Sequence, residues 1–467
     1  MTNEKLSIAF EGGSRRLVYS WLMLAMVSLI FAGLFAFLLA MARTPHIQDI
    51  LPGRDYFRVA LVDHVVLSIV IWFLTFNGVL WALTSSGVTG KPTYCMKLGM
   101  AGFALSALGT AFIIMPALMG LGTPMFTNYI PVLDHPLYFT GLFLFALGLL
   151  AYIANILLTY FSAARDGANI FRAEITGMMV CALAVISALL CYLFAYLTFP
   201  EGLKKFIYLE HFFWGGGHIL QFSNTIGMLV VWILLVKITL NTSAISDKAG
   251  SILFALFIPF IMAAPLIFFF YEGGTDEYKK AFTILMQYGY GITVALIGLA
   301  VIKSIITAGK KAPLPWGEPG FSALVFSLLL FITGGIFALF IKDSNTKIPA
   351  HYHGVIGAVT TSFMGFSYYI LPMIKRRAPC PKLARYQPYI YGIGQLLFAI
   401  GLFWAGGHGV ARKTYGAAQG LDNFGKIAGM TMMGVGGLIA IAGGASYVYN
   451  ILFGLLGKKD ESEAVAD

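Results

Sequence analysis

Long apolar runs alternate with short polar segments along the whole chain. Each run is long enough to cross a hydrocarbon core of ~30 Å as a helix that rises 1.5 Å per residue. The pattern predicts an all-α, polytopic membrane bundle of about 12 helices over residues 17–457, between short tails at 1–16 and 458–467. The runs cover residues 17–42, 59–84, 95–120, 137–162, 175–199, 211–240, 250–271, 281–309, 319–341, 348–374, 386–410 and 425–457.

Composition agrees with this fold class. Of the 467 residues, 58% are hydrophobic and 11% are charged. Soluble domains carry roughly 25% charged residues, so a soluble or disordered protein is excluded. The net charge of +10 does not indicate nucleic acid, because the basic residues lie in short loops that set membrane topology. The 4 cysteines form no CxxCH or CxxC motif, which excludes a covalently attached c-type haem and a paired thiolate site.

Basic residues also predict the orientation. The densest cluster, at 375–385, falls on an inner loop if the N-terminus is inside. Because cytoplasmic loops are enriched in Lys and Arg, we expect both termini in the cytoplasm. The first apolar run is too long for a signal peptide and lacks a cleavage site, so it predicts the first span. We expect an integral protein of a bacterial or archaeal inner membrane.

The 8 histidines all fall in the outer part of the predicted bundle. His64, His218, His351 and His353 lie within apolar helices, where a polar side chain needs a partner. The others are expected at or near the outer interface, which histidine tolerates, and they are His46, His135, His211 and His408.

The segment His351-Tyr352-His353 places two imidazoles at positions i and i+2 of one helix. These positions are about 200° apart, so the two rings cannot share one metal. Each ring can instead bind a different planar cofactor, and two haems flanking the helix fit this arrangement. His64 lies at the depth needed for the second axial ligand of one haem. A haem with histidine on one side only is open to a small gas. Two hydrogen-bonded interfacial histidines explain the spacing equally well.

His218 follows three glycines in the sequence Trp214-Gly-Gly-Gly-His218. The glycines allow a bulky group to approach the helix backbone, or they allow tight helix packing. His211 lies seven residues earlier on the same face, about 10 Å away, too far to share a metal ion with His218.

In this order and at these depths, the motifs resemble those of the haem–copper oxidase superfamily, catalytic subunit I, which includes terminal oxidases and nitric oxide reductases. Tyr56 to His64 is similar to the span-2 segment that carries a low-spin haem ligand. Trp214 to Phe222 resembles the span-6 motif that supplies a ligand to the non-haem metal. His351 to Gly354, followed by Tyr369-Ile-Leu-Pro372, resembles the span-10 H-x-H motif.

The resemblance implies a role for each matching histidine. His64 and His353 would be the axial ligands of a low-spin haem, and His351 would be the proximal ligand of a second, high-spin haem. Haem b is the expected type. His218 would lie on the distal side of the second haem as a ligand for copper or iron. His351 and His218 would then be the catalytic residues.

The segment Gly409 to Lys413 resembles the basic segment after span 11. The resemblance implies that Arg412 and Lys413 pair with haem propionates, which places the haems near the outer face. The sequence contains no cupredoxin or cytochrome domain. Electrons would therefore come from a separate cytochrome c-like or cupredoxin subunit, or from quinol.

The sequence departs from the family pattern around the non-haem metal. The adjacent histidines expected at the outer end of span 7 are replaced by Phe269 and Phe270, and no histidine lies between His218 and His351. The tyrosine that many oxidases carry four residues after the span-6 histidine is Phe222. A phenylalanine cannot donate the proton and electron needed to split O₂.

Three explanations stay open. Gln221 and Glu272, with His218 and His211, could form an oxygen-richer metal site that favours iron over copper. Alternatively the metal site is lost, and the protein is a two-haem electron carrier or a sensor of gas. Thirdly, Glu272 is only a solvated residue at the start of an outer loop.

Two classes of function follow. The first is an oxidoreductase that passes electrons from the low-spin to the high-spin haem and reduces a small gas there. Nitric oxide is favoured over O₂, because the tyrosine and the histidine pair are missing. The second is a non-catalytic haem subunit that transfers electrons within a larger respiratory complex. A transporter without haem is disfavoured, because nothing at the midplane resembles a substrate site.

Overall fold

The computed structural model describes residues 8–10, 13–47 and 55–457. The predicted tail 458–467 lies outside the described residues, and so does much of the tail 1–16. Within the described ranges, 12 helical segments are long and apolar enough to span a membrane. The hydrophobic pattern therefore predicts the fold class correctly. The largest difference in position is at the sixth span, which begins at Lys205 rather than at residue 211.

The helical elements occur in the following order: α2 (Arg15–Arg43), α3 (Asp55–Val65), η1 (Val66–Ile71), α4 (Trp72–Ala82), η2 (Leu83–Val88), α5 (Met96–Met119), α6 (Pro136–Arg165), α7 (Ala173–Thr198), α8 (Lys205–Leu240), α9 (Asp247–Ala255), α10 (Ile258–Ala263), α11 (Ile267–Phe270), α12 (Asp276–Gly309), α13 (Pro319–Ala338), α14 (Lys347–Met373), α15 (Pro381–Gly407), η3 (Gly416–Gln419) and α16 (Phe424–Leu456). The second span comprises α3, η1, α4 and η2, and the seventh comprises α9, α10 and α11.

The chain divides into two compact units. Unit 1 comprises Met1–Leu24 and Phe73–Leu314, and unit 2 comprises Ala25–Trp72 and Pro315–Asp467. The division falls within α2 and within the second span, so each of these contributes to both units. The single membrane domain over 17–457 stays a prediction.

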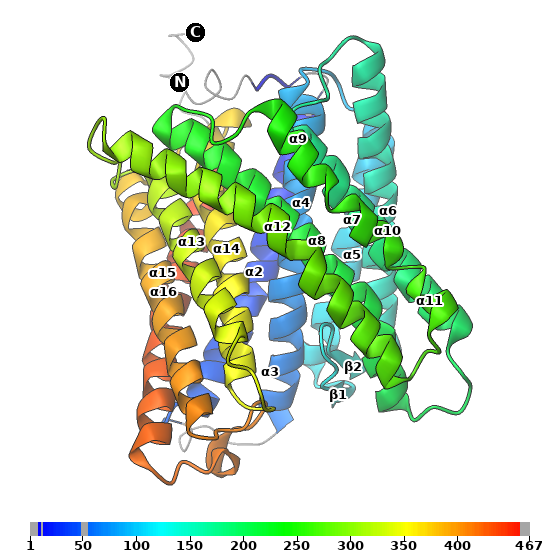
Figure 1. Ribbon diagram of the computed structural model, residues 1–467, viewed down its shortest axis with the longest axis vertical. Coiled ribbons are helices and arrows are strands. Elements are labelled where there is room, and N and C mark those ends of the chain that lie inside the picture. Colours follow the sequence, from blue (N-terminus) through cyan, green and yellow to red (C-terminus); the bar gives the residue numbers. More distant parts are fainter. Residues whose placement is uncertain (1–7, 11–12, 48–54, 458–467) are drawn as a thin grey trace. The chain divides into compact units, whose positions relative to one another are not determined.

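In unit 1, α8 packs against α7 and α12 (Figure 1). The helices α5 and α6 form a second pair and are connected by a small β-hairpin. Its antiparallel strands are β1 (Thr123–Met125) and β2 (Val132–Asp134). The loop that joins the two strands covers residues 126–131.

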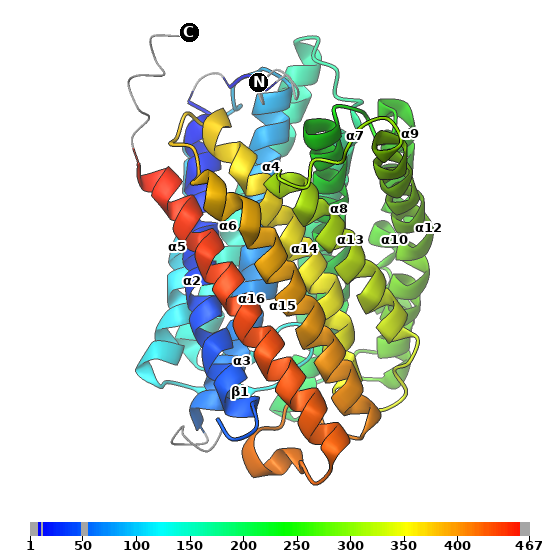
Figure 2. The same cartoon turned by 90° about the vertical axis from the view of Figure 1, so that its left-hand side faces the viewer.

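In unit 2, α15 and α16 lie side by side along most of their length (Figure 2). Glycines allow this close approach. A Cβ atom at Gly436 would lie 2.4 Å from the backbone nitrogen of Phe398, and one at Gly394 would lie 2.4 Å from that of Ala440. Small residues at a helix interface let the two backbones come into contact in the membrane. This seam fixes the position of Phe398, whose ring lines the cavity described below.

The second span changes its winding close to His64. The π-helical segment η1 begins two residues after this histidine. The hydroxyl of Ser68 donates to the carbonyl oxygen of His64, which satisfies a backbone acceptor where the regular helical ladder is interrupted. Short π-helical segments are frequent at functional sites.

We expect the substitution Gly436→Ala to destabilise the protein by roughly 1–3 kcal/mol, because the added methyl group would force α15 and α16 apart. Gly335→Ala in α13 is the matched control, since a Cβ atom there meets nothing within 4 Å. Thermal unfolding of both variants in detergent measures the difference. Equal melting temperatures for the two variants would show that the seam does not limit stability.

Candidate functional site

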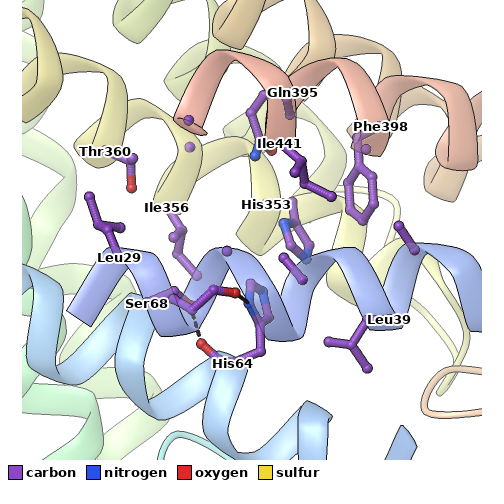
Figure 3. A pocket seen from close by; sticks show the side chains of 18 of the residues that line it. Leu29, Leu39, His64, Ser68, His353, Ile356, Thr360, Gln395, Phe398 and Ile441 are labelled. Carbon is purple, nitrogen blue, oxygen red and sulfur yellow. Dashed lines mark hydrogen bonds between the residues drawn. The ribbon is translucent and has the colours of Figure 1, made fainter. Parts of the chain in front are cut away.

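His64 and His353 line one cavity of about 570 Å³ within unit 2. Its walls come from α2, α3, η1, α14, α15 and α16, with Trp72 of α4 and the segment 412–413 after α15, and they are mostly apolar. Figure 3 shows the two imidazole rings entering this cavity from different helices, His64 from α3 and His353 from α14. Mostly apolar cavities of ~300–1,000 Å³ with a few polar groups are typical of cofactor sites.

The ring of His64 is oriented by a neighbouring helix. Its Nδ1 donates to the carbonyl oxygen of Ala32 in α2, at 3.0 Å. This bond sets the tautomer and leaves Nε2 with a lone pair. Metal-binding histidines almost always have their second nitrogen fixed in this way.

His353 is held by packing instead. Its ring lies edge-on to that of Phe398, with centroids 4.5 Å apart and planes at 60°. Within the described part of the chain, no hydrogen bond is found for either ring nitrogen of His353. An imidazole in an apolar cavity needs such a partner, so this ring suits a ligand of the cavity.

Basic residues line the same cavity, namely Arg43, Arg412 and Lys413. The Nε and Nη2 atoms of Arg43 are buried and have no hydrogen-bond partner among the described residues. Buried guanidinium nitrogens without a partner are costly and are well suited to a carboxylate. The cavity therefore fits a haem, because it offers two imidazoles, apolar walls and cations for the propionates. Arg43 was not among the residues predicted from the sequence, because its only signal is its place at the end of the first apolar run.

His351 points to a different neighbour from His353. Its Nδ1 donates to the carbonyl oxygen of Gly334 in α13, at 2.8 Å. The helices α13 and α14 approach closely here, because a Cβ atom at Gly354 would lie 2.6 Å from the Cα atom of Gly334. Nε2 of His351 is left available on the side of α14 that does not contribute to the cavity. This geometry fits a single axial ligand of a second haem.

His218 lies in unit 1 and has a partner for each ring nitrogen. Its Nδ1 donates to the carbonyl oxygen of Trp214 at 2.7 Å. Its Nε2 lies 2.8 Å from the hydroxyl oxygen of Tyr129. Since Nδ1 carries the proton, Nε2 accepts from the tyrosine hydroxyl. Tyr129 belongs to the loop between β1 and β2 and has a positive φ of 65°.

The three glycines before His218 each admit an aromatic ring from a neighbouring element, and all of these rings belong to unit 1. A Cβ atom at Gly215 would lie 2.7 Å from the ring of Phe282, and one at Gly216 would lie 2.3 Å from the ring of Tyr192. A Cβ atom at Gly217 would lie 2.4 Å from Cβ of Tyr129. Of the two interpretations of the glycines, these contacts correspond to tight packing within the protein.

Glu210 holds the hairpin loop. Its carboxylate accepts from the backbone nitrogen of Asn128 at 2.8 Å and from the Nδ2 of the same residue at 2.6 Å. Burial, together with the negative charge of Glu210, raises the pKa of Tyr129 well above its ordinary value. The hydroxyl of Tyr129 therefore stays protonated and remains a donor.

The other predicted ligands of a non-haem metal do not gather around His218. Glu272 is exposed and Gln221 is partly buried. No group of three or more His, Cys, Asp or Glu side chains in the described part of the chain could hold a metal ion. The donor set around His218 therefore does not fit a copper or iron site, and that site stays a prediction.

Aromatic side chains fill the positions where the family carries polar groups. Phe222 is fully buried and stacks on Tyr290, with centroids 4.4 Å apart. The expected histidine pair is replaced by Phe269 and Phe270, which are 69% and 79% exposed. No hydroxyl or imidazole therefore stands at position 222, 269 or 270.

The remaining histidines lie at element ends or bond to their own helix. His46 has a positive φ of 67°, and His135 is the N-cap of α6, where it accepts from the backbone nitrogen of Leu137. His211 donates to the carbonyl oxygen of Ile207 in its own helix. His408 donates to the carbonyl oxygen of Trp404 at the end of α15.

Relatives of known sequence share most of the chain. An uncharacterized protein of Rickettsia prowazekii is 28% identical over 514 residues, covering 96% of this chain and 98% of the relative. Cytochrome c oxidase subunit 1 of Thermus thermophilus is 23% identical over 454 residues, covering 90% of this chain and 80% of that protein.

The fold is shared with a solved structure. A chain from a heme-copper terminal oxidase dimer, studied by cryo-EM, superposes with a TM-score of 0.78 at 18% identity. The match covers 96% of this chain and 85% of the other. The family described as Cytochrome C and Quinol oxidase polypeptide I matches residues 16–441. The protein is therefore a member of the cytochrome c and quinol oxidase polypeptide I family, the subunit I of the haem–copper oxidase superfamily.

Proposed function

We propose that this subunit carries electrons through two haems within a larger respiratory complex of the inner membrane. One haem would be held by His64 and His353, and the second by His351. The observation that carries the proposal is that His64 and His353 line the same apolar cavity, with two guanidinium nitrogens of Arg43 beside them that have no partner among the described residues.

The polar and aromatic residues named above each have a role in the proposed haem site. A haem with two imidazole ligands supplies one-electron transfer without an open coordination position. The carbonyl of Ala32 keeps Nε2 of His64 unprotonated, and the ring of Phe398 restricts that of His353. Arg43 and the basic pair at 412–413 would neutralise the propionates. The apolar walls exclude water, which strengthens these charge interactions.

The path between the haems would run through one helix. His351 and His353 are separated by a single residue of α14, so their relative positions are fixed by covalent bonds and helix geometry. His351 is held by α13 and His353 by α15. The two rings therefore serve different sides of one rigid element, which suits fast electron transfer.

Topology supports a placement of the haems near the outer face. His353 lies near the start of α14, and the basic cluster at 375–385 follows the end of that helix. Because such clusters favour the cytoplasm, the histidine end would face outward and the termini inward. A cytochrome c-like or cupredoxin subunit, or quinol, would then supply the electrons.

A second candidate function is the reduction of a small gas at the haem on His351. Phe222 favours nitric oxide over O₂ as the substrate, because no phenol is present at position 222 to assist O–O cleavage. Two NO, two electrons and two protons give nitrous oxide and water. The surroundings of His218 favour the first function, since they do not offer the ligands of a third metal.

We expect His64→Ala and His353→Ala each to abolish the bis-histidine low-spin haem signal in electron paramagnetic resonance, and to lower haem content by about one per chain. The reason is that each variant removes one of two axial ligands. His408→Ala is the matched control, since His408 bonds to its own helix at the end of α15. An unchanged low-spin signal in either cavity variant would refute the assignment of the cavity.

We expect His351→Ala to lose the second haem and with it the binding of carbon monoxide to the reduced protein, while the low-spin signal is kept. Pyridine haemochrome and carbon monoxide difference spectra measure both quantities.

The same preparation of the unmodified protein, given reduced donor and nitric oxide, tests the second candidate function. Formation of nitrous oxide at a rate abolished by His351→Ala would favour gas reduction over electron transfer alone.

A further inference from the structure

The hairpin formed by β1 and β2 is tied to α8 at two points. Glu210 accepts two hydrogen bonds from Asn128, at 2.8 and 2.6 Å. Further along the hairpin, Asp134 pairs with Lys205 at 2.6 Å. The loop is also closed internally, since the hydroxyl of Thr127 donates to the carbonyl of Ile130 at 2.6 Å. The position of Tyr129, between these points, is therefore fixed by the fold.

The side chain of Tyr129 fills the space next to His218. The two ring centroids are 4.4 Å apart, and Gly217 leaves room for Tyr129 against the backbone of α8. The rings of Trp214 and Phe282 lie 4.9 and 6.1 Å from that of His218. The imidazole is thus surrounded by aromatic rings and is 1% exposed.

No polar atom of His218 is left over for a metal ion. Nδ1 donates to Trp214 and Nε2 accepts from Tyr129. A protein site for copper or iron normally needs several nitrogen, oxygen or sulfur ligands around one point. Within the ranges that the structure describes, no cluster of three or more His, Cys, Asp or Glu side chains could provide such a site.

We infer that Tyr129 takes the place of the non-haem metal as the partner of His218, and that this subunit binds no third metal. The inference refines the proposed function, because it separates this chain from enzymes that reduce gases at a haem and a second metal. What remains in the pocket is a neutral phenol–imidazole hydrogen bond. This pair can donate or relay a proton, but it does not supply the three protein ligands of a metal site.

A metal count tests the inference on the purified full-length protein. Iron, copper, zinc and manganese are measured by mass spectrometry and compared with haem from the pyridine haemochrome. We expect all iron to be haem iron and less than about 0.2 of any other metal per chain, also after incubation with excess Cu²⁺ or Fe²⁺ and desalting. About one non-haem metal per chain, lost in His218→Ala but kept in His211→Ala, would overturn the inference.

The hydrogen bond itself is tested by a cycle of variants. We expect Tyr129→Phe to lower the melting temperature by roughly 2 °C, the effect of one lost buried hydrogen bond in a chain of this size. In a His218→Ala background the same change should have almost no effect, because the acceptor is already gone. Equal shifts in both backgrounds would contradict the pairing.

Tyr192→Phe is the matched control for the cycle. Its ring packs on Gly216 of the same glycine run, but its hydroxyl has no hydrogen-bond partner among the described residues. Its removal should leave the melting temperature unchanged. If His218→Ala does not fold, the metal count on the unmodified protein and the difference between Tyr129→Phe and Tyr192→Phe still decide the inference.

The two proposals fail in different ways. Loss of the haem assignment would appear as a haem content that does not respond to His64→Ala or His353→Ala, whatever the state of His218. If the Tyr129 assignment is wrong, a non-haem metal would be found, or Tyr129→Phe would shift the melting temperature equally with and without His218, while both haems are present.

Discussion

An imidazole inside a membrane helix must satisfy two ring nitrogens where water cannot reach, and the candidate sites depend on this constraint. In each of three cases a backbone carbonyl oxygen accepts a hydrogen bond from Nδ1: that of Ala32 for His64, of Gly334 for His351 and of Trp214 for His218. The chemistry is then decided by what meets Nε2. At His64 it is a cavity that fits a cofactor, whereas at His218 it is the hydroxyl of Tyr129. The same residue type can therefore be a haem ligand in one place and a hydrogen-bond acceptor in another.

Close helix packing is what supplies these carbonyls and partners. His351 reaches α13 because Gly334 and Gly354 let two backbones meet. Phe398 reaches His353 from α15, which is set by its seam with α16. Lipid offers no hydrophobic driving force between helices, so such contacts stabilise the bundle by packing and by hydrogen bonds. The residues that stabilise the fold thus also orient the candidate ligands.

The helical spans and the opposed directions of His351 and His353 could be predicted, because both depend on the local period of a helix. Tyr129 could not, since its bond to His218 joins residues 89 positions apart through a hairpin loop that has no periodic signal. The same holds for the contact of Glu210, because its partner Asn128 lies in that loop. Arg43 looked like an ordinary basic residue at a helix end, and only the cavity beside it gives it a role.

The aromatic side chains around His218 form one packed group. Phe282, whose ring lies 6.1 Å from that of His218, packs on Phe268, and the hydroxyl of Tyr129 meets Nε2 of His218. Phe222, one turn further along α8, stacks on Tyr290 of α12. Replacing Phe222 would therefore remove buried packing, whereas Phe269 and Phe270, at the positions of the expected histidine pair, are 69% and 79% exposed. His218 is therefore enclosed by aromatic rings and has a hydrogen-bond partner for each ring nitrogen, so the burial of this imidazole is satisfied within the fold.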